Sequence, residues 1–232
     1  MAVALIVAAG RGERLGSDRP KALVSLGGRP MLEWSLDALR AVQAVGEIVV
    51  ALPADWLHAA PAGVIAVAGG AQRSHSVRAA LACSGDGDPV IVHDAARPLA
   101  TATLFTQALE ELERSRADAV IAAAPVTDTI KESAPDGRTV ARTLDRSRLW
   151  AIQTPQVFRR AALAAALAGP DAHLARATDD AWLIEHAGGT VRIVASDPGN
   201  LKVTTPEDLR LAELILAQRA AAAGADRETP AR

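Results

Sequence analysis

Short apolar runs that alternate with helical segments constrain the fold of this chain more than any other feature of its sequence. The runs are typical of buried parallel strands, and the segments between them carry apolar residues at helical spacing. Because strands that alternate with helices form a parallel sheet with right-handed crossovers, we predict an α/β fold with a mostly parallel sheet flanked by helices. The expected strands are 3–7, 47–52, 64–68, 89–94, 119–124 and 190–194, and the expected helices include 29–39, 73–81, 101–115, 178–186 and one that begins at 205.

The alternation is interrupted between about residues 126 and 148. Segments 127–133 and 138–144 alternate polar and apolar residues, and they flank a strong turn signal at Ala134-Pro135-Asp136-Gly137. They predict a protruding β-hairpin arm, 126–148, with little hydrophobic cover. Because an isolated hairpin is marginal alone, we expect the arm to pack on another subunit. A solvated excursion from the edge of the sheet is the alternative.

The length of 232 residues suits one large α/β domain, and no linker divides the chain, so we expect residues 1–232 to form a single domain that includes the arm. The final helix begins at Thr205-Pro206, a capping threonine followed by a proline in the first turn, and is expected to end near residue 222. The tail 224–232 is expected to be disordered.

Composition argues against several classes of protein. No segment approaches the roughly 18–20 uninterrupted apolar residues of a membrane span, and the first strand lacks the pattern of a signal peptide. Cys83 is the only cysteine, which excludes an intrachain disulfide and fits the cytoplasm. A net charge of −2, four tryptophans, two phenylalanines and no tyrosine provide neither a basic field nor many stacking surfaces for nucleic acid. We therefore expect a cytoplasmic protein that binds neither membranes nor nucleic acid.

A glycine-rich, cationic loop follows the first expected strand. Small residues let the backbone approach a bulky ligand, and clustered cations at a strand end are what a polyphosphate needs. The loop has Leu15 where the dinucleotide fingerprint needs a small residue, and Ser17-Asp18 follows Gly16 where a P-loop needs Lys-Ser/Thr. We interpret it as another kind of nucleotide loop; a solvated glycine-rich turn is the alternative. Its glycines and cations are Gly10, Gly12, Gly16, Arg11, Arg14, Arg19 and Lys21.

Asp94 ends the fourth expected strand, in His93-Asp94-Ala95-Ala96-Arg97-Pro98. A carboxylate at the carboxyl end of a strand, beside a phosphate loop, is well placed to hold Mg²⁺ or a ribose hydroxyl. The alternative is an Asx turn with a salt bridge to Arg97. His93 is expected to be structural.

Two further regions are candidates for ligand contact. The segment from Gly70 to Val77 places two hydroxyls and an arginine at a helix start, where Ser74 or Ser76 either caps the helix or contacts a base or ribose. Arg146, after the arm, and Lys202, before the final helix, are solvated charges if each is taken alone. No nucleophilic triad and no His/Cys metal cluster is apparent in the sequence. Local cations and one carboxylate therefore indicate phosphoryl-group chemistry, which depends on positioning and electrostatic stabilisation.

These motifs together resemble a known family. The run A-A-G-R-G-E-R-L-G-S-D-R-P-K resembles the signature loop of the Rossmann-like nucleotidyltransferases. The further motifs are similar to those of the 2-C-methyl-D-erythritol 4-phosphate cytidylyltransferases of the non-mevalonate isoprenoid pathway, from about residue 3 to 216. They are G-G-A-Q-R-S-H-S-V, V-H-D-A-A-R-P, D-T-I-K, D-R-S-R-L-W-A-I-Q-T-P-Q-V-F, A-T-D-D-A and N-L-K-V-T-T-P-E-D-L.

The resemblance implies a Rossmann-like nucleotidyltransferase domain that transfers CMP from CTP to the phosphate of 2-C-methyl-D-erythritol 4-phosphate, with Mg²⁺ as the divalent cation. It implies Arg14 and Lys21 as the cations that stabilise the transition state, and Arg146 and Lys202 as the pair that positions the acceptor. The implied CTP contacts are Ala8, Ala9, Gly10, Gly70, Ser76, Asp94 and Ala95, with Asp94 also the metal ligand. The implied weaker acceptor contacts are Arg97, Thr127, Thr154 and Thr178.

The resemblance also implies a homodimer, because the arm matches one that hooks over a second subunit in this family and supplies some substrate contacts. The sequence departs from many relatives at Ala22, where they carry glutamine, and at Ala71, where some carry an acidic residue. These departures bear on the contacts to the base or ribose and not on the reaction. A ribitol-5-phosphate cytidylyltransferase is the nearest rival, but the chain follows the methylerythritol type around Ala95-Ala96 and before Gln153. A sugar-1-phosphate nucleotidyltransferase and a non-catalytic nucleotide-binding module are the more distant alternatives.

Overall fold

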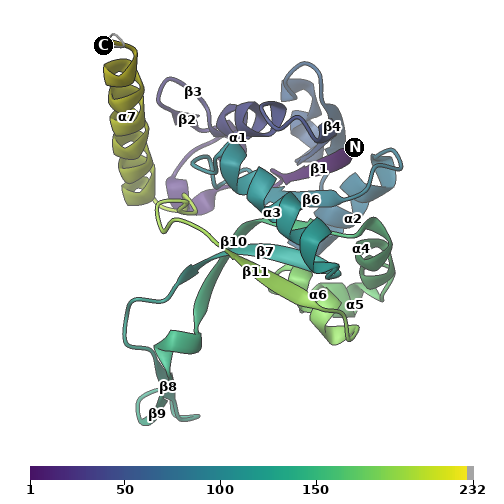
Figure 1. Ribbon diagram of the computed structural model, residues 1–232, viewed down its shortest axis with the longest axis vertical. Coiled ribbons are helices and arrows are strands. Elements are labelled where there is room, and N and C mark those ends of the chain that lie inside the picture. The colour runs from purple at the N-terminus through teal and green to yellow at the C-terminus, as the bar shows by residue number, and fades with distance from the viewer. Residues whose placement is uncertain (229–232) are drawn as a thin grey trace.

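The computed structural model describes residues 1–228, and a seven-stranded sheet with helices on both faces forms its centre (Figure 1). The strand order is β11-β7-β10-β6-β1-β4-β5; β10 is antiparallel to both of its neighbours, and the other pairs are parallel. This arrangement confirms the predicted mostly parallel α/β sheet. The strands are β1 (Ala2–Val7), β4 (Val45–Leu52), β5 (Ile65–Ala68), β6 (Val90–Asp94), β7 (Ala119–Pro125), β10 (Trp150–Phe158) and β11 (Val191–Ala195).

Different helices bury the two faces of the sheet. Successive side chains of a strand point to opposite faces, so Ile6 packs in a core with α1 and α3, and Leu5 packs in a second core with α2, α4 and α6. The helices are α1 (Met31–Arg40), α2 (Arg73–Cys83), α3 (Ala102–Ser115), α4 (Arg160–Leu167), α5 (Asp171–Leu174), α6 (Asp180–His186) and α7 (Pro206–Glu228). None of the helices within residues 1–228 has the length and apolar character that crossing a membrane requires.

The predicted arm is a two-stranded hairpin, β8 (Lys131–Ser133) and β9 (Val140–Thr143), that protrudes from the body (Figure 1). Asp136 closes its turn, because one carboxylate oxygen accepts hydrogen bonds from the backbone N–H groups of Arg138 and Thr139, each at 2.9 Å. Every residue of both strands is exposed. The hairpin is therefore present as predicted, and its packing on a second subunit stays a prediction.

The helix α7 begins as predicted and continues further than predicted. Thr205 Oγ1 accepts from the backbone N–H of Asp208 at 3.2 Å, and the Asp208 carboxylate accepts from the N–H of Thr205 at 2.9 Å. The expected end near residue 222 differs from the observed end at Glu228, because Gly224 continues the helix instead of ending it. The rest of the expected disordered tail, 229–232, lies outside the described residues.

The starts of two helices also differ from expectation. Pro30 precedes α1 and belongs to a short ribbon of β2 (Ser25–Leu26) and β3 (Arg29–Pro30). The helix expected over 178–186 begins at Asp180, because the Asp179 side chain caps it by accepting from the N–H of Trp182 at 2.9 Å. Thr178 thus lies in the loop before α6.

Candidate active site

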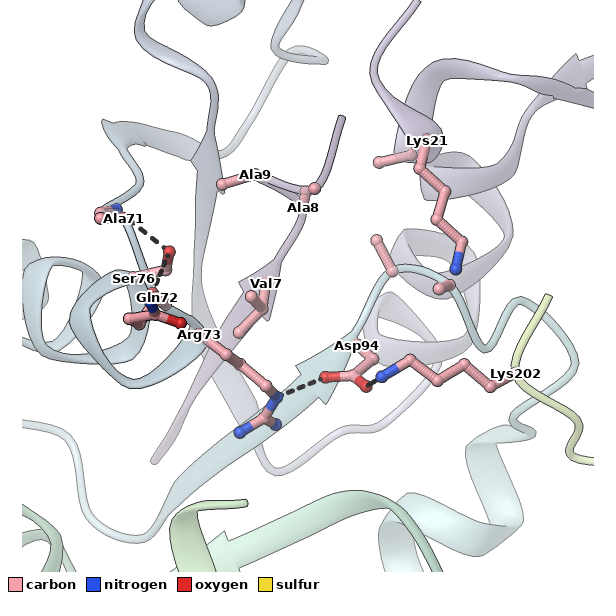
Figure 2. Close-up of a pocket in the computed structure, with 15 residues that line it drawn as sticks. Val7, Ala8, Ala9, Lys21, Ala71, Gln72, Arg73, Ser76, Asp94 and Lys202 are labelled. Carbon is pink, nitrogen blue, oxygen red and sulfur yellow. Dashed lines mark hydrogen bonds and ion pairs between the residues drawn. The ribbon is translucent and has the colours of Figure 1, made fainter. Parts of the chain in front are cut away.

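A pocket of about 250 Å³ lies at the carboxyl ends of β1 and β6, beside the start of α2 (Figure 2). This edge is where ligands bind in sheets of this class. The pocket brings together most of the residues that the sequence motifs single out. Those that line it are Ala8, Ala9, Gly10, Lys21, Gly70, Ser76, Asp94, Ala95 and Lys202.

The glycine-rich loop folds back on itself, so that Lys21 returns beside Gly10. The backbone N–H of Lys21 donates to the carbonyl of Gly10 at 3.0 Å. Gly12 has a φ of +74°, and a Cβ atom on it would lie 2.9 Å from Lys21 Cβ, so only glycine fits this turn. The loop opens no α-helix; it contains a short 3₁₀ turn, Glu13–Leu15, and ends in a second one, Lys21–Leu23. Arg14 lines an adjoining cavity of about 730 Å³ that shares Lys21 with the first pocket.

Cations crowd around Lys21. Burial, together with the charges of Lys202 and Arg14, lowers the pKa of Lys21 to about 8. The Lys21 ammonium has a long hydrogen bond of 3.5 Å to Thr204 Oγ1. A positive site with so little compensation favours a polyanion such as a nucleotide triphosphate.

Asp94 is held by two cations at the pocket (Figure 2). Its Oδ1 accepts from Arg73 Nε at 2.9 Å, and its Oδ2 pairs with Lys202 Nζ at 2.7 Å. Burial opposes ionisation of the carboxyl, but the charges of Arg73 and Lys202 outweigh it and hold the pKa of Asp94 well below its usual range. The salt bridge to Arg97, considered as an alternative, does not form; the Arg97 guanidinium donates to the carbonyls of Asn200 and Ile152 at 2.7 and 3.1 Å.

Arg73 is a site residue to which the sequence motifs gave no role. It is the first residue of α2, and its guanidinium bonds both Asp94 and the fully buried Asp180. The signal in the sequence was an arginine shortly after Gly-Gly at a helix start. Its second partner is 107 positions away, and nothing local could have indicated that pairing.

Neither serine near the start of α2 caps the helix. Ser76 Oγ accepts from the N–H of Gly70 at 3.1 Å and donates to the carbonyl of Gln72 at 3.2 Å, and Ser74 Oγ donates to the carbonyl of Leu174 at 2.8 Å. Ser76 therefore shapes the Gly69-Gly70 turn. A Cβ atom on Gly69 would lie 2.3 Å from Ala9 Cβ, so this glycine lets the turn approach the first loop closely.

A second pocket, of about 190 Å³, adjoins the first on the side of β10. Among the expected acceptor contacts, Arg97, Thr154, Thr178 and Lys202 line it. Thr154 Oγ1 also accepts from the backbone N–H of Asp94 at 3.1 Å and lies 2.9 Å from His93 Nδ1. Burial lowers the pKa of His93 to about 4, so this fully buried imidazole is neutral and structural.

Arg146 and Thr127 lie away from both pockets. The Arg146 guanidinium donates to the carbonyl of Thr127 at 2.6 Å, and both residues are exposed. They belong to the segment that carries the arm, and within residues 1–228 of a single copy they do not line the pockets that hold the other site residues.

The sequence and the fold resemble those of one set of known proteins. Residues 2–218 match the family model described as 2-C-methyl-D-erythritol 4-phosphate cytidylyltransferase. The protein of that name from Nocardia farcinica (strain IFM 10152) is 47% identical over 225 residues, covering 94% of this chain and 95% of the relative. That from Synechococcus sp. (strain WH7803) is 44% identical over 223 residues, covering 93% and 99%. The crystal structure of 2-C-methyl-D-erythritol 4-phosphate cytidylyltransferase from Thermus thermophilus matches with a TM-score of 0.77 at 35% identity, covering 94% of this chain and 100% of the other.

Proposed function

The chain belongs to the 2-C-methyl-D-erythritol 4-phosphate cytidylyltransferase family, and from that premise we propose how its site performs the reaction. The enzyme transfers CMP from CTP to the phosphate of 2-C-methyl-D-erythritol 4-phosphate in isoprenoid biosynthesis. The products are 4-diphosphocytidyl-2-C-methyl-D-erythritol and pyrophosphate. The relatives named above carry this name throughout, which favours it over the ribitol 5-phosphate and non-catalytic alternatives.

CTP is proposed to bind in the two cavities of about 250 and 730 Å³ that share Lys21, with its α-phosphate beside that residue. The observation that carries this proposal is the clustering of positive charge at Lys21, where the charges of Lys202 and Arg14 lower its pKa and its ammonium has no ion pair among the described residues. Backbone N–H groups of the loop face the phosphates in this arrangement. Arg14 and Lys21 then offset the charge on the transferring group, an effect worth a few kcal/mol for each well-placed donor.

The acceptor is proposed to bind in the second pocket, with Arg97, Thr154, Thr178 and Lys202 around it. Its phosphate is a monoester with a second pKa near 6, so at neutral pH it is already a dianion and needs no general base. The neutral, fully buried His93 is consistent with that chemistry. The phosphate oxygen attacks the α-phosphorus of CTP in line, and pyrophosphate leaves.

The described part of the chain suits a metal that is held mainly by the nucleotide. It contains no group of three His, Cys, Asp or Glu side chains able to hold an ion. Mg²⁺ is commonly bound through one or two carboxylates and substrate phosphates, and Asp94 supplies one carboxylate. We propose Asp94 Oδ2 as the protein ligand, in exchange for the half-exposed Lys202. When bound, the ion neutralises charge on the triphosphate and on the leaving pyrophosphate.

A homodimer is proposed to complete the site, with Arg146 and Thr127 reaching the acceptor of the other subunit. The support is the exposed apolar surface of the arm and its base, where Val140, Trp150 and Ile152 are 57%, 36% and 40% exposed. Burial of such side chains is what a subunit interface provides. We also propose a cytoplasmic location, which the lone Cys83 supports.

Pyrophosphate release with CTP tests the acceptor. We expect turnover with 2-C-methyl-D-erythritol 4-phosphate and little with ribitol 5-phosphate at equal concentration. Activity with ribitol 5-phosphate alone would overturn the assignment. Sedimentation of the same preparation tests the dimer, and a monomer at the assay concentration would contradict the proposed role of the arm.

A further inference from the structure

Arg73 bridges two buried carboxylates that come from different parts of the fold. Its Nε donates to Asp94 Oδ1 at the end of β6, and its Nη1 donates to Asp180 Oδ2 at the start of α6. Asp94 and Asp180 are 6% and 0% exposed. A planar guanidinium can bond two carboxylates with fixed geometry, which a lysine ammonium does not reproduce. Arg73 therefore joins α2, β6 and α6 through one rigid group.

The two oxygens of Asp94 have unequal partners. Oδ1 is bonded to Arg73, whose side chain is 24% exposed, and Oδ2 to Lys202, whose side chain is 46% exposed. Arg73 is anchored a second time by Asp180, whereas Lys202 makes no other ion pair among the described residues. Lys202 lies in the loop between β11 and α7. Lys202 is thus the more exposed, singly paired partner of Asp94, and Arg73 is the doubly anchored one.

Arg73, Asp94 and Lys202 line both the 250 Å³ pocket and the 190 Å³ pocket. They are thus shared by the proposed nucleotide and acceptor sites and form the wall between them. Asp180 is not among the residues that line either pocket, and the Nη2 atom of Arg73 is buried without a hydrogen-bond partner. The nitrogen that bonds Asp180, Nη1, is therefore turned toward a residue that lines neither pocket.

We infer that Arg73, anchored by Asp180, is a positioning residue that fixes Asp94 with Oδ2 directed at the wall between the two pockets. Lys202 holds Oδ2 in the free enzyme and leaves it for the acceptor phosphate when CTP and its cation are bound. Asp180 accordingly acts on the nucleotide site through Arg73 and Asp94, without touching a ligand. The inference rests on the proposed function, which assigns the 250 Å³ pocket to CTP, the 190 Å³ pocket to the acceptor and Asp94 Oδ2 to the cation.

The competing possibility is that the pair of Arg73 and Asp180 only joins α2 to α6. Chain geometry offers a matched control, because Arg78, about one and a half turns further along α2, pairs with Asp171 of α5 at 2.7 Å. That pair also joins α2 to a neighbouring helix, but it is solvent-exposed, with side chains 41% and 71% accessible. Loss of a helix contact alone should affect both pairs through stability and neither through ligand binding.

The test is a double-mutant cycle on CTP binding, measured by calorimetry with Mg²⁺ on the full chain. Asp180→Asn and Arg73→Lys should each weaken CTP binding by about tenfold, as loss of a residue that orients a ligand carboxylate commonly does. In an Asp94→Asn background, Asp180→Asn should have no further effect, because its effect passes through Asp94. The controls Asp171→Asn and Arg78→Lys should bind CTP as the wild type does.

The inference is overturned if Asp180→Asn weakens binding equally in both backgrounds, or if it has no effect on a folded wild-type background. Circular dichroism and thermal unfolding establish that each variant is folded. Should Asp180→Asn not fold, Arg73→Lys takes its place in the cycle with the same two outcomes. Wild-type pyrophosphate release with 2-C-methyl-D-erythritol 4-phosphate is measured separately, so failure of the proposed reaction is distinguished from failure of the positioning role.

Discussion

Replacement of Lys21 by alanine should lower turnover strongly while leaving the fold intact. The Lys21 ammonium has one long hydrogen bond, of 3.5 Å to Thr204, so little native structure depends on it. The loop is held by the backbone bond from Lys21 N–H to the Gly10 carbonyl, which alanine keeps. Burial and the charges of Lys202 and Arg14 lower the pKa of Lys21 to about 8, which means that the charged side chain is disfavoured in the folded protein. Alanine therefore relieves repulsion and should not reduce the free energy of unfolding at pH 7.

The expected loss in turnover can be estimated from other sites that stabilise a developing negative charge. Removing one preorganised donor from a developing oxyanion costs about 2.7–4 kcal/mol, so kcat should fall by about 10²–10³-fold. Pyrophosphate release at saturating CTP and acceptor measures kcat, and thermal unfolding at pH 7 measures stability. Arg19→Ala is the matched control, because Arg19 is an exposed cation of the same loop that lines neither cavity. Turnover within about tenfold of the wild type in a folded Lys21→Ala protein would refute the role given to Lys21.

The same geometry leads to three further predictions. The pKa of Lys21 is about 8 in the folded protein and 10.5 ordinarily, so the unfolded chain binds more protons between these pH values. The wild type should therefore gain stability relative to Lys21→Ala as the pH rises from 8 to 10.5. An unchanged difference in the free energy of unfolding across that range would contradict this. Gly12→Ala should lower kcat more than Gly16→Ala. Both glycines have positive φ, but only a Cβ atom on Gly12 would contact Lys21. Equal losses of kcat in the two variants would show that backbone strain alone matters. Mixing Lys21→Ala and Arg146→Ala dimers under subunit exchange should restore activity, because each mixed dimer contains one site with both residues intact. No recovery of activity despite exchange would place Arg146 outside the neighbouring subunit's site.

Features that depend on residues close together in the chain were predictable from the sequence. The apolar runs indicated the strands of a parallel sheet, and Asp94 at the end of β6 could be placed beside the loop because carboxyl ends of parallel strands share an edge. Gly12 and Lys21 could be linked only loosely, since the fold-back of the loop depends on φ values that composition does not give.

Features that join distant residues were not predictable. The bridge from Arg73 to Asp180 spans 107 positions, and two charges in a sequence do not reveal that they will be buried together. The antiparallel insertion of β10 between β6 and β7 was equally hidden, because an apolar run does not encode the direction of its neighbours. Arg146 and Thr127 remain predictions, because their proposed partners belong to another copy of the chain.

The placement of β10 has a consequence for how this protein can vary. One continuous strand begins at the base of the arm and ends between two central strands, where Gln156 is in register with Val92 and Ile121. Thr154, on the same strand, accepts a hydrogen bond from the backbone of Asp94 at 3.1 Å. Excising the arm together with this strand would leave a gap in the middle of the sheet, whereas lengthening the hairpin beyond Lys131 and Thr143 would leave the register untouched. The length of the hairpin can thus change during evolution while strand β10, from which it extends, stays fixed in the sheet.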